Sequence, residues 1–585
     1  MHTYFSLKTK LNHLAFFAML LLISCCAPKS DLTDRDRNFD SDWKFIRSDA
    51  SGADNPSFDD SKWRTLDLPH DWSIEDVAPV VGKNQIGPFS EDSQGKVATG
   101  HVVGGIGWYR KSFVTEPAME GKKVQILFDG VYMNSEVWIN GQSLGVHPYG
   151  YTPFFYDLTP HLKPVGEKNI LAVRVNNSGK NSRWYSGSGI YRHVDLVVTD
   201  KVYLPIWGIS VSTPEVNKEK ATVKIKIDLA NESEKSGKLV VSTQLISPSN
   251  SGNVEAVTTI DPFSSAKAEA EQIFDLKNPE LWSPESPALY QAITELSFDG
   301  KVVDRQTTTF GIRSIAYSAD KGFLLNGEPI ELKGGCMHHD NGPLGSATID
   351  RAEERRVELM KKFGFNAIRT SHNPPSRQFL DACDRLGVLV IDEAFDQWQR
   401  PKNPEDYNLY FDKWHKQDLE SMILRDRNHP SVVFWSIGNE INERVDPSGL
   451  EIMKNLISII KNIDTTRPIT EAICFFWDHP TYKWESTVPA FAQLDVGGYN
   501  YQLGEYEKDH QIAPERLMMG TESFPLQAFE NWQMVEKHPY VIGDFVWTAM
   551  DYLGESGIGH ASVKKDTKDT FSMDWPWYNA YCGDI

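Results

Sequence analysis

The stretch VVFWSIGNE, residues 432–440, joins an apolar β-strand to a polar end. A short, continuous apolar run is typical of a strand that is buried on both faces of a parallel sheet. Asn439 and Glu440 follow directly, where such a strand would end. Reactive groups in α/β folds usually lie at the carboxyl ends of the strands. The stretch therefore predicts a parallel α/β domain with its chemistry at the strand ends.

The same alternation of strand-like and helix-like segments covers residues 317–585. The helical segments include 353–363, 412–425 and 450–463, and one in which Phe379, Leu380, Cys383 and Leu386 share a face. The expected strands are 330–334, 366–369, 388–391, 432–437, 468–470, 495–498, 517–519 and 541–546. Eight β/α units predict a (β/α)8 TIM barrel. No closing helix precedes Ile585, so we expect the barrel to be C-terminally incomplete.

Two earlier regions have the period of β-strands instead. Residues 38–202 contain short alternating segments, and Asn140-Gly141 between two β-branched runs is a strong hairpin signal. Residues 203–316 keep the strand pattern with more Lys, Glu and Ser. We predict a jelly-roll β-sandwich followed by a smaller immunoglobulin-like β-sandwich.

The N-terminus has the pattern of an export signal. Lys8 and Lys10 precede an apolar segment, 14–24, that is too short to cross a membrane. Leu22-Ile23-Ser24-Cys25 resembles the lipobox of bacterial lipoproteins. We predict a lipoprotein signal peptide at 1–24, a lipid on Cys25, a polar spacer at 25–37 and a location in the cell envelope, in the periplasm or on the outer membrane. An ordinary secretory signal is the alternative.

Composition narrows the class of partner. The 585 residues include 80 acidic and 60 basic side chains, a net charge of −20 that repels phosphate backbones and disfavours nucleic acid. The 17 Trp, 21 Tyr and 29 Phe suit either large cores or platforms for sugar rings. The 6 cysteines lack metal-ligand spacing. We predict neither a disulfide nor a metal site, and no cofactor requirement.

Two glutamates stand out among the polar residues at the strand ends. Glu440 ends the fourth strand and Glu522 the seventh, on roughly opposite sides of the barrel mouth. A retaining glycosidase needs two carboxyl groups about 5–5.5 Å apart, one as acid/base and one as nucleophile. We predict these roles for Glu440 and Glu522 in turn. The predicted substrate-binding residues are Arg369, His372, Asn439, Tyr501, His338, His339 and Trp547.

Three of these residues have a specific expected role. Arg369 would keep Glu522 ionised as a nearby cation, and Tyr501 would orient the same carboxylate. Asn439 would bond the sugar 2-hydroxyl.

Each assignment has a structural alternative. Glu440 could belong to a surface ion pair with its neighbours Glu443 and Arg444. Asp392 and Glu393 compete for a catalytic role. Arg369 could form a salt bridge with Asp392, His338 and His339 could be packing residues or half of a metal site, and Trp547, like Trp435, could belong to the core.

The motifs resemble those of glycoside hydrolase family 2, the retaining exo-β-glycosidases that include β-galactosidases, β-glucuronidases and β-mannosidases. The resemblance covers nearly the whole chain after the signal. It rests on Pro69-His70-Asp71-Trp72, Gly107-Trp108-Tyr109-Arg110, Trp138-Ile139-Asn140-Gly141, Gly187-Ser188-Gly189-Ile190-Tyr191-Arg192, Phe310-Gly311-Ile312-Arg313, Arg369-Thr370-Ser371-His372-Asn373-Pro374-Pro375 and Trp435-Ser436-Ile437-Gly438-Asn439-Glu440. It implies that Glu440 is the acid/base. Thr521-Glu522-Ser523 matches the nucleophile position more loosely.

The resemblance also bears on the substrate. Family glucuronidases bind the sugar carboxylate with an Asn-x-Lys pair, whereas Asn579-Ala580-Tyr581 lies in roughly that region without the lysine. Segments 336–340 and 544–548 look more like those of β-galactosidases from gut-type bacteria. We therefore expect a β-galactosidase, with β-glucuronidase and β-mannosidase as alternatives. Some family members bind Mg²⁺ or Na⁺ near the acid/base, but this sequence has no separate signal for an ion.

A protein of another class remains an alternative. Two β-sandwiches on a lipid anchor could form a surface glycan-binding lipoprotein with an inactive barrel, or a structural adhesin. The retained set of Glu440, Glu522, Arg369 and Tyr501 favours the enzyme. In either case the expected partner is an oligosaccharide or glycan, and the oligomeric state is left open.

Overall fold

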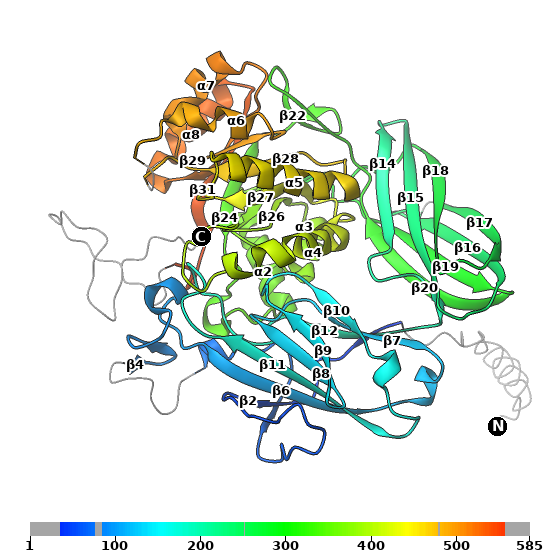
Figure 1. The fold of residues 1–585 in the computed structure, drawn as a ribbon. Helices are drawn as coiled ribbons and strands as arrows, with labels where there is room; N and C mark the ends of the chain where they lie inside the picture. The colour runs from blue at the N-terminus through cyan, green and yellow to red at the C-terminus, as the bar shows by residue number, and fades with distance from the viewer. Residues whose placement is uncertain (1–34, 76–84, 251, 478–479, 556–585) are drawn as a thin grey trace, which may run out of the picture.

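The computed structural model describes residues 35–75, 85–250, 252–477 and 480–555. The chain forms two β-sandwiches and an α/β barrel (Figure 1). The predicted signal peptide, the lipidation site at Cys25 and the segment at Asn579 lie outside the described residues.

The first sandwich packs two antiparallel sheets around one core. One sheet has the order β1 (Asp36–Asn38), β12 (Val194–Thr199), β7 (Lys123–Phe128) and β10 (Phe154–Asp157). The other is β3 (Arg64–Leu66), β2 (Trp43–Ile46), β6 (Gly105–Val114), β11 (Lys168–Asn177), β8 (Ser135–Ile139) and β9 (Gln142–His147). A short pair, β4 (Gln85–Ile86) and β5 (Phe89–Ser90), lies outside them.

The predicted hairpin in this sandwich is confirmed. Asn140 and Gly141 connect β8 to β9 with φ of 53° and 85°, the left-handed conformation that a two-residue hairpin turn requires.

The second sandwich is immunoglobulin-like. Its sheets are β13 (Val202–Tyr203), β15 (Lys220–Asn231) and β14 (Ile209–Val216) with β18 (Lys267–Lys277) beside β15, and β17 (Asn253–Phe263), β16 (Gly237–Ile246), β19 (Tyr290–Phe298) and β20 (Lys301–Phe310). A small sheet of β21 (Ile315–Ser318), β22 (Gly322–Leu325) and β23 (Glu328–Pro329) then leads into the barrel.

The predicted barrel is closed by eight parallel strands in chain order. They are β24 (Leu332–Met337), β25 (Ala367–Thr370), β26 (Leu389–Glu393), β27 (Val432–Asn439), β28 (Ile469–Ile473), β29 (Gly497–Asn500), β30 (Met518–Ser523) and β31 (Val541–Met550). The helices around them are α2 (Asp350–Lys362), α3 (Arg377–Leu386), α4 (Asn408–Asp426), α5 (Pro447–Ile463), α6 (Val488–Phe491), α7 (Tyr506–Ile512) and α8 (Ala528–Lys537). The fold class read from the sequence is therefore correct.

One strand end differs from the prediction. β31 continues to Met550, so Trp547 lies within the strand and not at its end. The strand is extended because it pairs on both sides: Val546 lies opposite Gly335 of β24 and Ser523 of β30. A bulge in the β24 pairing then brings Met550 opposite Met337.

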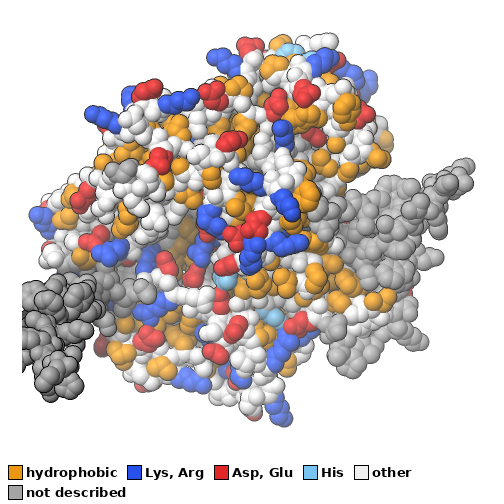
Figure 2. Space-filling view, turned by 180° about the vertical axis from the view of Figure 1, so that it is seen from behind, with side chains coloured by type: hydrophobic (Ala, Val, Ile, Leu, Met, Phe, Trp, Pro, Cys, Tyr) orange, Lys and Arg blue, Asp and Glu red, His pale blue; other side chains and the backbone are white. Residues whose placement is uncertain are grey.

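Core and surface divide as expected from the sequence. Trp435 is fully buried beneath the helices, and its indole nitrogen donates to Asp464 at 2.9 Å, so its assignment to the core is confirmed. Basic and acidic side chains are interspersed on the face shown in Figure 2. None of the helices in the described ranges combines the length and the apolar character needed to span a membrane.

Candidate active site

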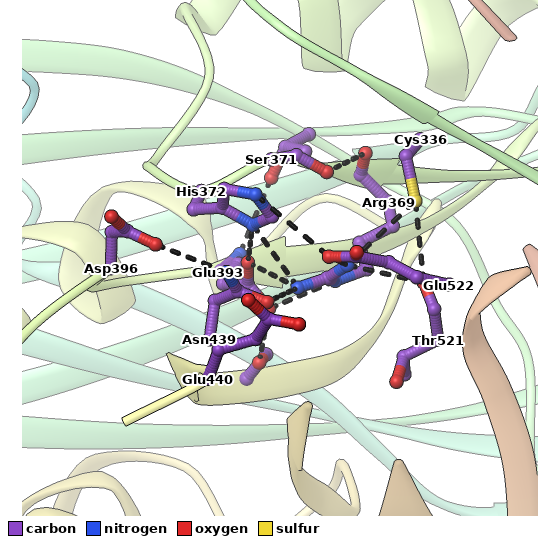
Figure 3. Close-up of polar contacts among 12 residues, drawn as sticks. Cys336, Arg369, Ser371, His372, Glu393, Asp396, Asn439, Glu440, Thr521 and Glu522 are labelled. Carbon is purple, nitrogen blue, oxygen red and sulfur yellow. Dashed lines mark hydrogen bonds and ion pairs between the residues drawn. The ribbon is translucent and has the colours of Figure 1, made fainter. Parts of the chain in front are cut away.

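Arg369 connects the strand ends that carry the two predicted catalytic residues. Its guanidinium is fully buried. Nη1 donates to Oε1 of Glu522 at 2.8 Å, and Nη2 donates to Oδ1 of Asn439, also at 2.8 Å. Nε and Nη2 bond both oxygens of Glu393 at 2.9 and 2.8 Å. Figure 3 shows this guanidinium between the three partners, with Glu440 beside them.

Glu440 is placed by a sharp turn at the end of β27. Its φ is 45°, a left-handed conformation that is uncommon for a residue with a side chain and is often found at functional sites. Its backbone N–H donates to the carbonyl of Ala472 on β28 at 2.8 Å, which fixes the turn. The amide of Asn500, at the end of β29, donates to Oε1 of Glu440 at 3.2 Å. The backbone of Glu440 is therefore held from β28 and its carboxyl group from β29.

Glu522 is buried and interacts with Glu440. Burial is the largest influence and raises the pKa of Glu522 to about 8; Arg369 lowers it, and Glu440 raises it. Arg369 therefore lowers the pKa of Glu522 as expected, but burial outweighs this effect in the free protein. The raised pKa favours the protonated form of Glu522 near neutral pH in the free protein.

Tyr501 bonds Glu522, the contact predicted from the sequence. Its φ is 59°, and its backbone N–H donates to the carbonyl of Glu522 at 2.8 Å. A hydrogen bond from its hydroxyl group lowers the pKa of Glu522. The residue therefore orients the predicted nucleophile from the adjacent strand.

Aromatic rings form a wall beside the carboxyl groups. His372 stacks on Trp547 with centroids 5.1 Å apart, and His338 lies edge-on to Trp547 at 5.2 Å. Trp184, from the first sandwich, stacks on His338 at 4.9 Å. Burial and then Arg369 hold the pKa of His372 well below its usual range, so the ring is neutral. Its Nδ1 lies 2.8 Å from Glu393 and its Nε2 is 3.9 Å from Glu522.

His339 lies at a domain boundary, and the contacts found for it are not with the carboxyl pair. Its Nε2 is 3.0 Å from the carbonyl of Ser186 in the first sandwich, and its ring packs edge-on against Tyr151 at 5.2 Å. These contacts match the packing alternative. The role of His339 in sugar binding stays a prediction.

The competing assignments are resolved by where the side chains lie. Asp392 interacts with Asp426 and Arg425 of α4, so it does not pair with Arg369. Glu393 accepts hydrogen bonds from Arg369, Ser436 and His372 and acts as a buried structural acceptor.

The surface-pair alternative for Glu440 also lacks support. Glu443 accepts the backbone N–H groups of Gln399 and Arg400 at 2.9 and 3.1 Å. Arg444 donates to the carbonyl groups of Ile441 and Phe475.

Several residues of this site have no role predicted from the sequence. Asp396, three residues beyond β26, accepts from Arg183, Lys402 and Asn439, and Asn500 bonds Glu440. Glu555 interacts electrostatically with Arg183 and Glu440. Asp396 follows β26 and Asn500 ends β29, and a polar residue at such a position is a usable signal. Arg183 and Trp184 lie far away in the chain and carry no such signal.

The surroundings of Asp396 also test whether an ion fits next to the acid/base. Both of its oxygens accept from Arg183, and one also accepts from the Lys402 ammonium and from Asn439. These donors repel a cation, so this position does not fit Mg²⁺ or Na⁺.

A closed (β/α)8 barrel with paired glutamates at the ends of β27 and β30 is the arrangement of a glycoside hydrolase. Family models give the same class independently. The models are "Glycosyl hydrolases family 2, sugar binding domain" over residues 37–200, "Glycosyl hydrolases family 2" over 206–313, and the "TIM barrel domain" of that family over 318–555.

Individual relatives agree with these models. Beta-galactosidase BoGH2A of Bacteroides ovatus is 38% identical over 91% of this chain and 70% of its own. A beta-glucuronidase of Bacteroides fragilis is 28% identical over 92% of this chain and 78% of its own. The crystal structure of a family 2 member from Bacteroides cellulosilyticus matches with a TM-score of 0.83 and 46% identity, over 88% of this chain and 65% of that one. The chain belongs to glycoside hydrolase family 2, whose members act on O-glycosyl bonds.

Proposed function

We propose that this chain is a retaining exo-β-glycosidase that removes terminal β-galactosyl residues. Glu440 protonates the leaving oxygen while Glu522 attacks the anomeric carbon, and a covalent glycosyl-enzyme forms. Glu440 then takes a proton from water while the water oxygen attacks the anomeric carbon and displaces the Glu522 carboxylate, which releases the sugar with its anomeric configuration retained. The carboxyl pair on β27 and β30, joined by Arg369 and Asn439, is the observation that carries the proposal.

The raised pKa of Glu522 supports this mechanism. It keeps one proton in the site near neutral pH. When a substrate binds, Arg369 and Tyr501 favour the charge on Glu522, which places the proton on Glu440. A general acid and a nucleophile are then present together.

The charges around the pair favour a neutral sugar. In the part of the chain that the structure describes, the cations Arg369, Arg183 and Lys402 each already bond a carboxylate. A uronic acid would add its carboxylate near Glu440, Glu522 and Glu555. The β-galactosidase from Bacteroides ovatus supports the same choice. The β-glucuronidase from Bacteroides fragilis keeps glucuronides as the alternative.

Hydrolysis of a panel of 4-nitrophenyl β-glycosides tests the proposal. We expect the galactoside to have the highest kcat/KM, and Glu440→Ala to lower kcat about 10²–10⁴-fold on a poor leaving group. Azide should rescue Glu440→Ala and give the β-glycosyl azide, whereas Glu522→Ala should give the α-azide. A 2-deoxy-2-fluoroglycoside should add the mass of one sugar to the peptide that contains Glu522.

The possible outcomes separate the alternatives. Preference for the glucuronide or mannoside would keep the mechanism and change the substrate. No hydrolysis by a folded protein that still binds glycans would favour the glycan-binding lipoprotein.

We also propose that the protein is a cell-envelope lipoprotein anchored through Cys25. The support is the lipobox-like sequence Leu22-Ile23-Ser24-Cys25 behind a basic and apolar leader. Expression of the wild type and of Cys25→Ser in a bacterial host, followed by detergent phase partitioning, tests it. We expect the wild type in the detergent phase and the variant in the aqueous phase; equal partitioning would exclude the anchor.

A further inference from the structure

Arg183 reaches the barrel mouth from the first sandwich. It lies in the connection between β11 and β12, and its neighbours anchor it: Asn403 of the barrel donates to the carbonyl of Ser182 at 2.7 Å, and Trp184 donates to the hydroxyl of Tyr151 at 3.1 Å. Its Nε and Nη2 donate to the two oxygens of Asp396 at 2.8 and 2.7 Å. This two-pronged contact sets both the position and the plane of the carboxylate.

Asp396 transmits this constraint to the residue before the acid/base. The Nδ2 amide of Asn439 donates to Oδ1 of Asp396 at 3.0 Å. Lys402 donates from one ammonium group to the same Oδ1 at 2.8 Å and to the backbone carbonyl of Asn439 at 2.9 Å. The side chain and the carbonyl group of Asn439 are therefore fixed by one charged cluster.

The cluster is stable as a charged unit. Burial by itself would raise the pKa of Asp396, but Arg183 and Lys402 outweigh it and hold that pKa well below its usual range. The Asp396 side chain is only 3% exposed. An ionised carboxylate at this depth depends on its cationic partners, so the loss of one of them would disturb its position.

The opposite side of Asn439 faces the nucleophile. Its Oδ1 accepts from Arg369, which bonds Glu522, and from Asn500, which bonds Glu440. Asn439 thus links the charged cluster on one side to both catalytic carboxyl groups on the other (Figure 3). One amide hydrogen of Asn439 remains to contact a sugar hydroxyl.

We propose that Arg183 is a positioning residue of the active site: through Asp396 it orients the Asn439 amide toward the sugar 2-hydroxyl and fixes the peptide that precedes Glu440. The inference rests on the proposed function, because it concerns that reaction. It gives the first sandwich a part in positioning the active site. Arg183 itself need not touch the substrate.

A double-mutant cycle with two substrates tests this proposal. Arg183→Met, Asn439→Ala and the double variant are assayed on 4-nitrophenyl β-galactoside and on its 2-deoxy analogue. Since a misplaced contact can cost up to about 10²-fold, we expect Arg183→Met to lower kcat/KM on the galactoside by about 10- to 100-fold. The loss on the 2-deoxy substrate should be several times smaller. The double variant should be little worse than Asn439→Ala.

Controls separate positioning from weakening of the domain interface. Arg183→Lys keeps the positive charge but cannot make the two parallel bonds to Asp396, so its activity should lie between those of the wild type and Arg183→Met. If Arg183→Met does not fold, Arg183→Lys replaces it in the double-mutant cycle. Thr152→Val removes another interdomain bond, from Thr152 to Asp418 at 2.7 Å, and should change the two substrates equally. Equal losses on both substrates for the Arg183 variants, or additive losses in the double variant, would overturn the proposal. A wild type that cleaves no glycoside would instead overturn the proposed function.

Discussion

At the scale of single residues, the site concentrates charge where water is excluded. Glu522 and Glu393 lie against one guanidinium, that of Arg369, so two carboxyl groups share one cation. Burial also raises the pKa of Glu393, against the effect of Arg369. Such an arrangement suits a reaction that needs a proton on one carboxyl group and a charge on another. It also makes the buried carboxyl groups of the free protein costly to ionise.

Replacement of the nucleophile should therefore stabilise the barrel in a pH-dependent way. The folded state binds the Glu522 proton with a pKa of about 8, above the ordinary value, so wild-type stability falls as the pH rises from about 4.5 to 8. Glu522→Gln lacks this titration. We expect its Tm to exceed that of the wild type, and the difference to grow between pH 5 and 8, by calorimetry.

Glu331→Gln, at an exposed position, is the matched control. Its Tm difference from the wild type should stay constant over the same range. A constant difference for Glu522→Gln as well would contradict the raised pKa.

At the scale of elements, strand ends and helix starts place the catalytic side chains. The loop after β25 carries His372 and ends at Ser376, the N-cap of α3. The Ser376 hydroxyl accepts from the N–H of Phe379 at 3.2 Å and donates to Glu353 of α2 at 3.0 Å. One buried hydroxyl thus starts a helix and links it to its neighbour.

Loss of this cap should destabilise the barrel without a large change in catalytic activity. Ser376→Ala removes both bonds, and we expect a loss of about 1–2 kcal/mol, seen as a lower midpoint in urea unfolding followed by circular dichroism. Ser376→Thr keeps the hydroxyl group and should recover part of the loss. If Ser376→Ala unfolds at the wild-type urea midpoint, the Ser376 hydroxyl group does not contribute to the stability of the barrel.

At the scale of the whole molecule, the sandwiches and the barrel are joined by buried polar contacts. Asp71 of the first sandwich accepts from the backbone N–H groups of Ser73 and Ser188 and from the hydroxyl of Tyr185, and it also accepts the N–H of Ser346 beyond β24. The immunoglobulin-like domain is joined by Arg313, which donates to the carbonyl groups of Pro430 and Val432 at the start of β27.

Removal of the Asp71 charge should therefore weaken two domains together. In Asp71→Asn one oxygen becomes an amide that faces donors, and we expect a loss of at least about 2 kcal/mol. Calorimetry should show a lower Tm for the barrel as well as for the first sandwich. Asp320→Asn, at an exposed position, should leave both unchanged. A shift confined to the first sandwich would show that Asp71 does not couple the domains.

The amino-acid sequence by itself determined the three kinds of domain and the two glutamates. Strand and helix periods are local properties, and a polar residue directly after an apolar strand marks the mouth of a barrel. Glu440, Glu522, Arg369, Asn439 and Tyr501 all follow or end such strands, and they meet in one site.

Only the tertiary structure decided which side chains surround that pair. Arg183 and Trp184 reach the site from the first sandwich. Their neighbours in the sequence give no sign of this contact. Asp392 and Glu393 are adjacent, yet alternation along β26 sends one to α4 and the other to Arg369. The pKa of Glu522 depends on burial and on Glu440, which are set by packing and not by sequence spacing. Contacts between distant segments arise only when the closed barrel and the first sandwich bring them together.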